Sequence, residues 1–123
     1  MKTVIFVGLG GFIGASCRYL SGIWLAARYS PEVFPLNTLV INFLGCFLLG
    51  CLSGIGILGS EEWPVKEFLA LGVLGGFTTF SAFGLESFEM LKSGQFSMTI
   101  IYILISMILC LIAVGLGLLI AKQ

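Results

Sequence analysis

Residues 72–84 read GVLGGFTTFSAFG, and this stretch decides the interpretation of the chain. It places four glycines, three hydroxyl side chains and three phenylalanines within thirteen residues. The adjacent glycines Gly75 and Gly76, followed by two β-branched threonines, favour a break in a helix. Inside lipid, such a break is tolerated only where protein, water or an ion satisfies the freed backbone groups. We therefore expect a discontinuous helix that carries an ion or substrate site; the alternative is a continuous helix whose glycines allow close packing.

The composition of the whole chain is that of an integral membrane protein. Of its 123 residues, 59% are hydrophobic and 10% are charged, and the mean hydropathy is +1.14. Soluble domains carry about 25% charge, and a chain this short cannot bury so much apolar surface. Six basic and six acidic residues produce no basic field for phosphates, and there is no histidine. A soluble enzyme, a disordered chain and a nucleic-acid binder are therefore excluded.

Four apolar stretches cover the chain, separated by segments rich in charged and turn residues. Each is roughly 20 residues long, the length that a helix needs to cross about 30 Å of hydrocarbon. The expected spans are residues 4–25, 38–58, 68–88 and 98–120. We expect one all-α transmembrane domain, residues 1–123, with both termini on one side. The first span resembles a signal peptide, but apolar sequence resumes after Arg18, so we expect it to be retained.

The positive charges show no bias between the two sides of the predicted membrane domain. The residues on the N-terminal side are Lys2, Lys66 and Lys122, and those on the opposite side are Arg28, Lys92 and, if its side chain reaches that interface, Arg18. Orientation normally follows an excess of Lys and Arg on the cytoplasmic side. Without an excess, the chain could insert in both orientations, and two oppositely oriented copies could pair. We therefore expect an antiparallel, dual-topology homodimer.

Several polar residues lie inside the predicted spans, where such residues are functional candidates. Asn42 offers an amide in the second span; the alternative role is a hydrogen bond between helices. In the fourth span, Tyr102, Ser106 and Cys110 recur every four residues and share one face. That face could line a wet path or bond to a neighbouring helix, and its next member, Val114, is apolar.

Aromatic and charged residues add further candidates. Phe77, Phe80 and Phe83 are spaced by three, and the electropositive edges of their rings can accompany a small anion; the alternative is lipid or core contact. Arg18 could attract anions at a vestibule or could extend to the interface. Glu86 lies late in the third span, without an assigned role. The sequence contains no nucleophile–base pair, phosphate loop or carboxylate dyad, so we expect no enzymatic activity.

The four cysteines are scattered through apolar stretches and form no C-x-x-C pair. They are Cys17, Cys46, Cys51 and Cys110. A disulfide framework would require loop cysteines in a secreted scaffold. We therefore expect small hydrophobic side chains at helix contacts.

Three segments together resemble the Fluc family of fluoride channels, also called CrcB proteins. They are residues 10–15 (GGFIGA, followed by Arg18 and Tyr19), residues 37–45 (NTLVINFLG) and residues 75–83 (GGFTTFSAF). The resemblance covers the whole chain in length, number of spans and order of motifs. The third segment is the most specific, because this pattern rarely arises by chance in an apolar helix.

The resemblance implies an antiparallel homodimer with two fluoride pores and a structural sodium ion at the dimer interface. Matched to this chain, the sodium ligands are the backbone carbonyls of Gly75 and Thr78. The pore residues, by the same match, are Asn42, Phe80, Phe83, Tyr102 and Ser106, with Arg18 at the vestibule. Cys110 and Val114 depart from the hydroxyls that often continue this track, which puts the extent of the polar path in doubt.

We expect a passive channel, multi-pass in the cell (inner or plasma) membrane, that exports fluoride and so lowers its toxicity. Entry as HF and ionisation inside would supply the outward gradient. A small multidrug antiporter is one alternative, but it would need a membrane-embedded acid in its first span, and residues 1–28 contain none. The second alternative is a membrane scaffold that conducts no ions, in which the polar residues act only in helix packing.

Overall fold

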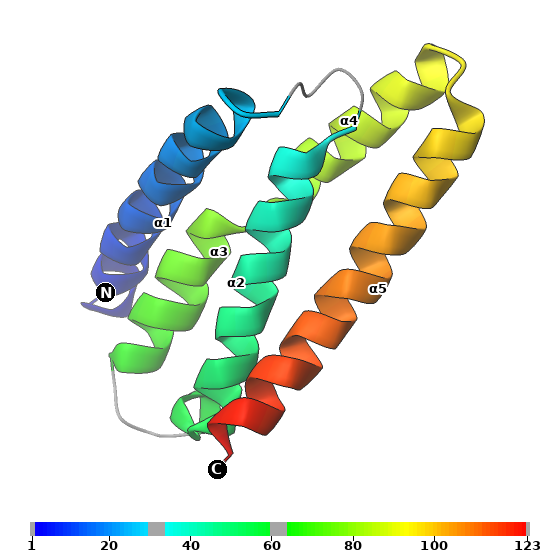
Figure 1. The fold of residues 1–123 in the computed structure, drawn as a ribbon. Coiled ribbons are helices and arrows are strands. Elements are labelled where there is room, and N and C mark those ends of the chain that lie inside the picture. The colour runs from blue at the N-terminus through cyan, green and yellow to red at the C-terminus, as the bar shows by residue number, and fades with distance from the viewer. Residues whose placement is uncertain (1, 30–33, 60–63, 123) are drawn as a thin grey trace.

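The computed structural model describes residues 2–29, 34–59 and 64–122, which form helices and turns without a strand (Figure 1). Four helical segments are long and apolar enough to cross a membrane. They are α1 (Lys2–Ala26), α2 (Leu36–Gly54), the segment Glu67–Lys92, and α5 (Phe96–Ala121). The prediction of an all-helical protein with four membrane-crossing segments is confirmed.

The third segment consists of several pieces. A π-helix, η2 (Glu67–Leu74), continues into α3 (Gly75–Phe77), and α4 (Phe80–Lys92) follows after two residues. Thr78 and Thr79, between α3 and α4, have extended backbone dihedrals, with φ/ψ of −77°/159° and −150°/119°. The segment extends four residues beyond the expected end at 88.

The second segment is shorter than expected. Helix α2 ends at Gly54, and Gly56 adopts a φ of 81°, a left-handed conformation that glycine accepts and that stops a helix. A short 3₁₀ turn, η1 (Ile57–Gly59), follows. The predicted loops at 28–32 and 59–64 fall largely on residues 30–33 and 60–63, outside the described residues.

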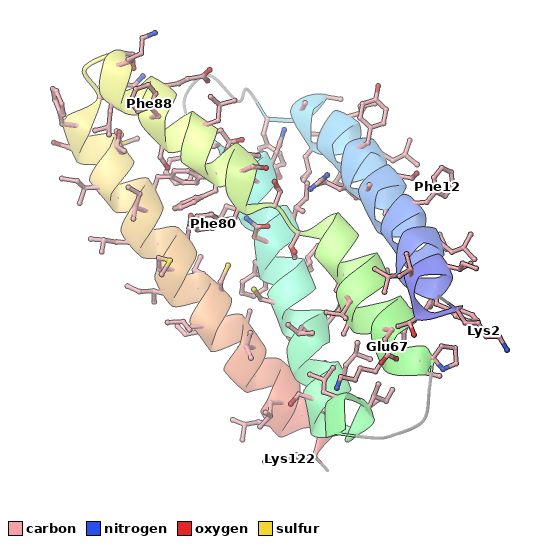
Figure 2. The ribbon with its side chains drawn as sticks, turned by 180° about the vertical axis from the view of Figure 1, so that it is seen from behind. Lys2, Phe12, Glu67, Phe80, Phe88 and Lys122 are labelled. Atoms are coloured by element: carbon pink, nitrogen blue, oxygen red, sulfur yellow. The ribbon has the colours of Figure 1, made fainter. Side chains whose placement is uncertain are left out.

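The segments alternate in direction, so Lys2 and Lys122 lie at the same end of the molecule (Figure 2). Helix α2 lies centrally, with α1 and α3 on one side and α5 on the other (Figure 1). Below the interruption, η2 and α3 pack against α1, whereas α4 lies beside α5. The third segment therefore changes partners at Thr78 and Thr79.

Glycines permit the closest helix contacts. A Cβ atom at Gly14 would overlap the Val73 carbonyl, and one at Gly10 would overlap the Phe68 carbonyl. Helix α2 meets α5 in the same way, because a Cβ at Gly50 would overlap the Val114 carbonyl. Small residues let helix backbones approach closely where lipid supplies no hydrophobic driving force.

The buried core is small and lies between α2, α4 and α5. Leu39, Met90 and Tyr102 form its centre, with Phe83 packed against them. Large apolar side chains point outward elsewhere; Phe12 is 73% exposed (Figure 2). This distribution is that of a protein whose outer surface faces hydrocarbon rather than water.

Candidate functional site

The interruption at Thr78 and Thr79 is held by hydrogen bonds rather than left open. The Asn42 side chain in α2 accepts a bond from the Thr79 backbone N–H at 2.8 Å and donates one to the Thr79 carbonyl at 2.9 Å. One amide therefore satisfies both backbone groups of Thr79. This pairing also determines the orientation of the amide, because only Oδ1 can accept and only Nδ2 can donate.

The same arrangement removes the helical donors from two carbonyls. In a continuous helix, the Gly75 carbonyl would accept from Thr79 N–H and the Thr78 carbonyl from Ala82 N–H. Instead, Thr79 N–H donates to Asn42, and Ala82 N–H donates to Thr79 Oγ1 at 3.2 Å as the cap of α4. The Gly75 and Thr78 carbonyls, which were predicted as sodium ligands, are thus among those that lose their helical donors at the interruption.

Arg18 contacts one of these carbonyls. Its Nη1 donates to the Thr78 carbonyl oxygen at 3.0 Å. A carbonyl oxygen has two lone pairs, so this bond leaves room for a second partner. Arg18 lines a cavity between α1, α2 and α4 together with Asn37 and Ser81.

A groove of about 390 Å³ opens on the other side of the interruption, between α2, α3, α4 and α5. Of the predicted site residues, it brings together Asn42, Gly75, Thr78, Phe80, Phe83 and Ser106. Its described lining residues carry no charged group, and most of them are apolar. Asn42, Thr78, Thr79 and Ser106 supply polar groups on its wall.

Three aromatic rings continue from the groove into the core. The Phe80 and Phe83 ring centroids lie 5.4 Å apart, and those of Phe83 and Tyr102 lie 5.2 Å apart, with the rings tilted in both pairs. Phe80 is 78% exposed and forms the outer end of the row, whereas Tyr102 is fully buried. Tyr102 is not among the groove-lining residues; it lies behind Phe83.

Ser106 is the unpaired polar group of the groove. Among buried side-chain polar atoms in the described residues, its Oγ is the one without a hydrogen-bond partner. An unsatisfied buried polar group costs about 1–3 kcal/mol. The hydroxyl is therefore available for a ligand that enters the groove.

Glu86 holds a partly buried network to which the sequence alone assigned no role. Its Oε1 accepts from Thr38 Oγ1 at 2.6 Å, and its Oε2 accepts from the Tyr102 hydroxyl at 2.7 Å. The carboxylate therefore ties α4 to both α2 and α5. An acidic residue inside a predicted span was the available signal; the distances to Thr38 and Tyr102 could not be read from the sequence.

Comparison with known proteins identifies relatives of the whole chain. Residues 5–118 match the family described as CrcB-like protein, Camphor Resistance (CrcB). A protein of Azobacteroides pseudotrichonymphae named "Fluoride-specific ion channel FluC" is 41% identical over 120 residues, which cover 95% of this chain and 94% of the relative. Proteins of the same name from Ruminiclostridium cellulolyticum and Flavobacterium psychrophilum are each 40% identical, covering 99% and 100% of this chain and 94% and 99% of theirs.

Proposed function

The chain belongs to the CrcB family, and on this premise we propose that it is a passive, fluoride-selective channel of the cell (inner or plasma) membrane. Its curated relatives are named as ion channels, so it is not an enzyme. The proposed direction is export from the cytoplasm, driven by fluoride that enters as HF and ionises inside.

The observation that carries this proposal is the fixed Asn42 amide on the wall of the groove. Oδ1, which would repel an anion, is engaged by Thr79 N–H. Nδ2 has two hydrogens, one of which goes to the Thr79 carbonyl. The second hydrogen remains for a ligand. The interruption in the third segment thus presents a donor, and not an acceptor, to the groove.

Fluoride is small and strongly hydrated, so a pore must replace its water with polarised donors. The Asn42 amide, the Ser106 hydroxyl and the ring edges of Phe80 and Phe83 are such donors, each of them weak. Together they would coordinate the ion without trapping it, because none of the described residues that line the groove is charged. A basic residue there would bind the anion too tightly for rapid exit.

We extend the proposal to an antiparallel homodimer with two pores. The groove is open along one side of a single chain, and Phe80 at its rim is 78% exposed. A second copy would close it and add its own rings. Arg18 lies at the interruption, so the two sides carry three positive residues (Lys2, Lys66 and Lys122) and two (Arg28 and Lys92). This near balance favours the inverted arrangement.

The same proposal includes a structural sodium ion held between the copies. Carbonyl oxygens are suitable ligands for a hard cation, and Gly75 and Thr78 have carbonyls whose helical donors are diverted. One chain offers two such groups, so a second copy would have to supply the rest. When bound, sodium would supply positive charge that stabilises these carbonyls. Arg18 would hold the Thr78 carbonyl in position from the other side.

The Glu86 carboxylate gives no support to the antiporter alternative. An antiporter needs an acid that meets the substrate, whereas both Glu86 oxygens accept hydrogen bonds from neighbouring helices. Helix α1 contains no acidic residue. These features fit a channel that moves one anion down its gradient.

A flux assay tests the proposal. Liposomes that contain the purified protein are loaded with potassium fluoride or potassium chloride, and release through the protein is followed with ion-selective electrodes. We expect fluoride release and retention of chloride. Equal rates for both anions would refute the selective site, and no release of either would favour the scaffold. Protein-free liposomes are the control.

A further inference from the structure

Helices α2 and α5 run side by side in the same direction (Figure 1). Thr38 and Tyr102 bind the same carboxylate, and Gly50 lies so close to Val114 that an added Cβ would overlap the Val114 carbonyl. Each of these pairs has the same separation along the chain. Residues four apart lie on the same face of a helix. The α2 and α5 residues that lie between these two pairs along the helices, with the same separation in the sequence, must therefore also face each other.

One of these intermediate pairs consists of two cysteines. Cys46 lies one turn before Gly50 in α2, and Cys110 lies one turn before Val114 in α5. Their side chains interact with each other. Neither cysteine is in a disulfide, and both line the groove. Neither is used by the proposed fluoride pathway.

From this juxtaposition we propose that Cys46 and Cys110 form a binding site for a soft divalent cation of the mercury(II) type, and that a cation bound there obstructs the groove. Thiolates are the ligands that soft cations prefer. Two ligands suffice for linear coordination, whereas a structural zinc site needs four. In the described residues no group of three or more His, Cys, Asp or Glu exists that could hold a harder ion.

Charge balance favours a divalent ion in this environment. Binding breaks two S–H bonds, forms two S–metal bonds and releases two protons to water, with no change in oxidation state. Two thiolates neutralise a divalent cation, so the complex carries no net charge. An apolar groove tolerates a neutral complex far better than a charged one.

The position of the pair determines its effect. The next level of the register, one turn or about 5.4 Å along the helices, contains Asn42 and Ser106, which also line the groove. A cation that bridges Cys46 and Cys110 would therefore occupy the space beside the proposed fluoride donors.

The remaining cysteines provide matched controls. Cys17 is exposed on α1, and Cys51 lies on α2 next to Gly50. Neither is among the residues that line the groove. A single thiol also binds mercury, but an excess of a small monothiol removes it. A cation held by two thiols resists removal, because the second thiol acts at a high effective concentration.

The first measurement is retention of the metal. Purified protein and the single variants Cys17→Ser, Cys46→Ser, Cys51→Ser and Cys110→Ser are incubated with mercury(II) acetate, washed with excess monothiol and measured by intact mass spectrometry. We expect one mercury per chain in the wild type and in the two control variants. We expect loss of retention in Cys46→Ser and Cys110→Ser. Equal retention in all five proteins, or loss in a control variant, would overturn the site.

The second measurement, which rests on the proposed function, is fluoride release from liposomes. Each protein is compared with its own untreated sample. Mercury should stop release by the wild type and by Cys17→Ser but not by Cys110→Ser, and a dithiol should restore it. Full release by mercury-loaded wild type would overturn the obstruction. If untreated wild type releases no fluoride, the proposed function fails, while mass spectrometry still decides the thiol site.

Discussion

Two close helix contacts in this molecule are both made by glycines, yet they differ in what they leave exposed. Where α1 meets η2, the backbones touch at Gly10, Gly14 and Gly72, with no space between them. Where α2 meets the interruption, Gly45 admits the Thr78 side chain, and Asn42 one turn earlier binds Thr79. The first contact is a closed interface between α1 and η2, and the second forms one wall of the groove. Glycine permits the approach in both places; polar side chains determine which one becomes a site.

The largest effect is expected from a substitution that disrupts the interface between α1 and η2. Gly14→Ala places a Cβ against the Val73 carbonyl and the Phe77 backbone nitrogen. Backbone cannot move aside as a side chain can, so we expect the free energy of unfolding to fall by about 3 kcal/mol. Denaturant unfolding in detergent, followed by circular dichroism, measures this loss. Gly8→Ala is the control, since nothing lies within 4 Å of its added Cβ. An equal loss in this variant would contradict a stabilising close contact between α1 and η2.

The next largest effect is expected on fluoride release through the groove. Asn42→Asp retains an acceptor for Thr79 N–H but turns a second oxygen toward the Thr79 carbonyl, and it adds negative charge to the proposed anion path. We expect fluoride release from liposomes to be suppressed. Loss of the Nδ2 bond also lowers the free energy of unfolding by about 1–3 kcal/mol.

Asn37→Asp is the matched control for this variant, because Asn37 lines the cavity on the other side of the interruption. It makes the same charge change without altering the groove. Wild-type release by Asn42→Asp at neutral pH would place residue 42 outside the pathway.

A smaller effect is expected from a substitution in the groove that slows fluoride release but leaves stability almost unchanged. Phe80→Ile removes a ring that is 78% exposed, so the free energy of unfolding should change by less than about 0.5 kcal/mol. The ring edge is lost, and we expect slower fluoride release at an unchanged elution volume on a sizing column. Phe88→Ile, also on α4 and 61% exposed, lies away from the groove and should release fluoride normally. Undiminished release by Phe80→Ile would remove this ring from the mechanism.

The last effect is on stability alone and concerns the network behind the groove. Tyr102→Phe removes the hydroxyl that donates to Glu86 and leaves the ring contacts with Phe83. We expect a loss of about 0.5–1.5 kcal/mol in the free energy of unfolding. A double-mutant cycle with Glu86→Gln should show that the two changes are coupled. Additive effects would contradict a shared network.

Much of the fold could be predicted from composition and periodicity. Runs of roughly 20 apolar residues predicted four membrane-crossing segments, and the described residues contain four helical segments that are long and apolar enough to cross a membrane. The four-residue repeat of Tyr102, Ser106, Cys110 and Val114 was also visible in the sequence. The end of α2 was placed four residues too late, because hydropathy does not detect the left-handed conformation at Gly56.

The candidate site was only partly predictable. Glycines and threonines at 75–79 marked the place where helical bonding is weak, and Asn42 was recognisable as an amide in an apolar span. Their pairing was not, since Asn42 and Thr79 are 37 residues apart. Glu86 had no predicted partner for the same reason, and the contact of Arg18 with Thr78 joins residues 60 apart.

The sequence by itself determined that this chain has four apolar segments long enough to cross lipid and which polar residues lie within them, because composition and hydropathy are local properties. Only the tertiary structure decided which backbone groups at the interruption are satisfied and which remain available. That depends on distances between α1, α2 and the third segment, and hydrogen bonds form only when donor and acceptor from distant parts of the chain come within about 3 Å.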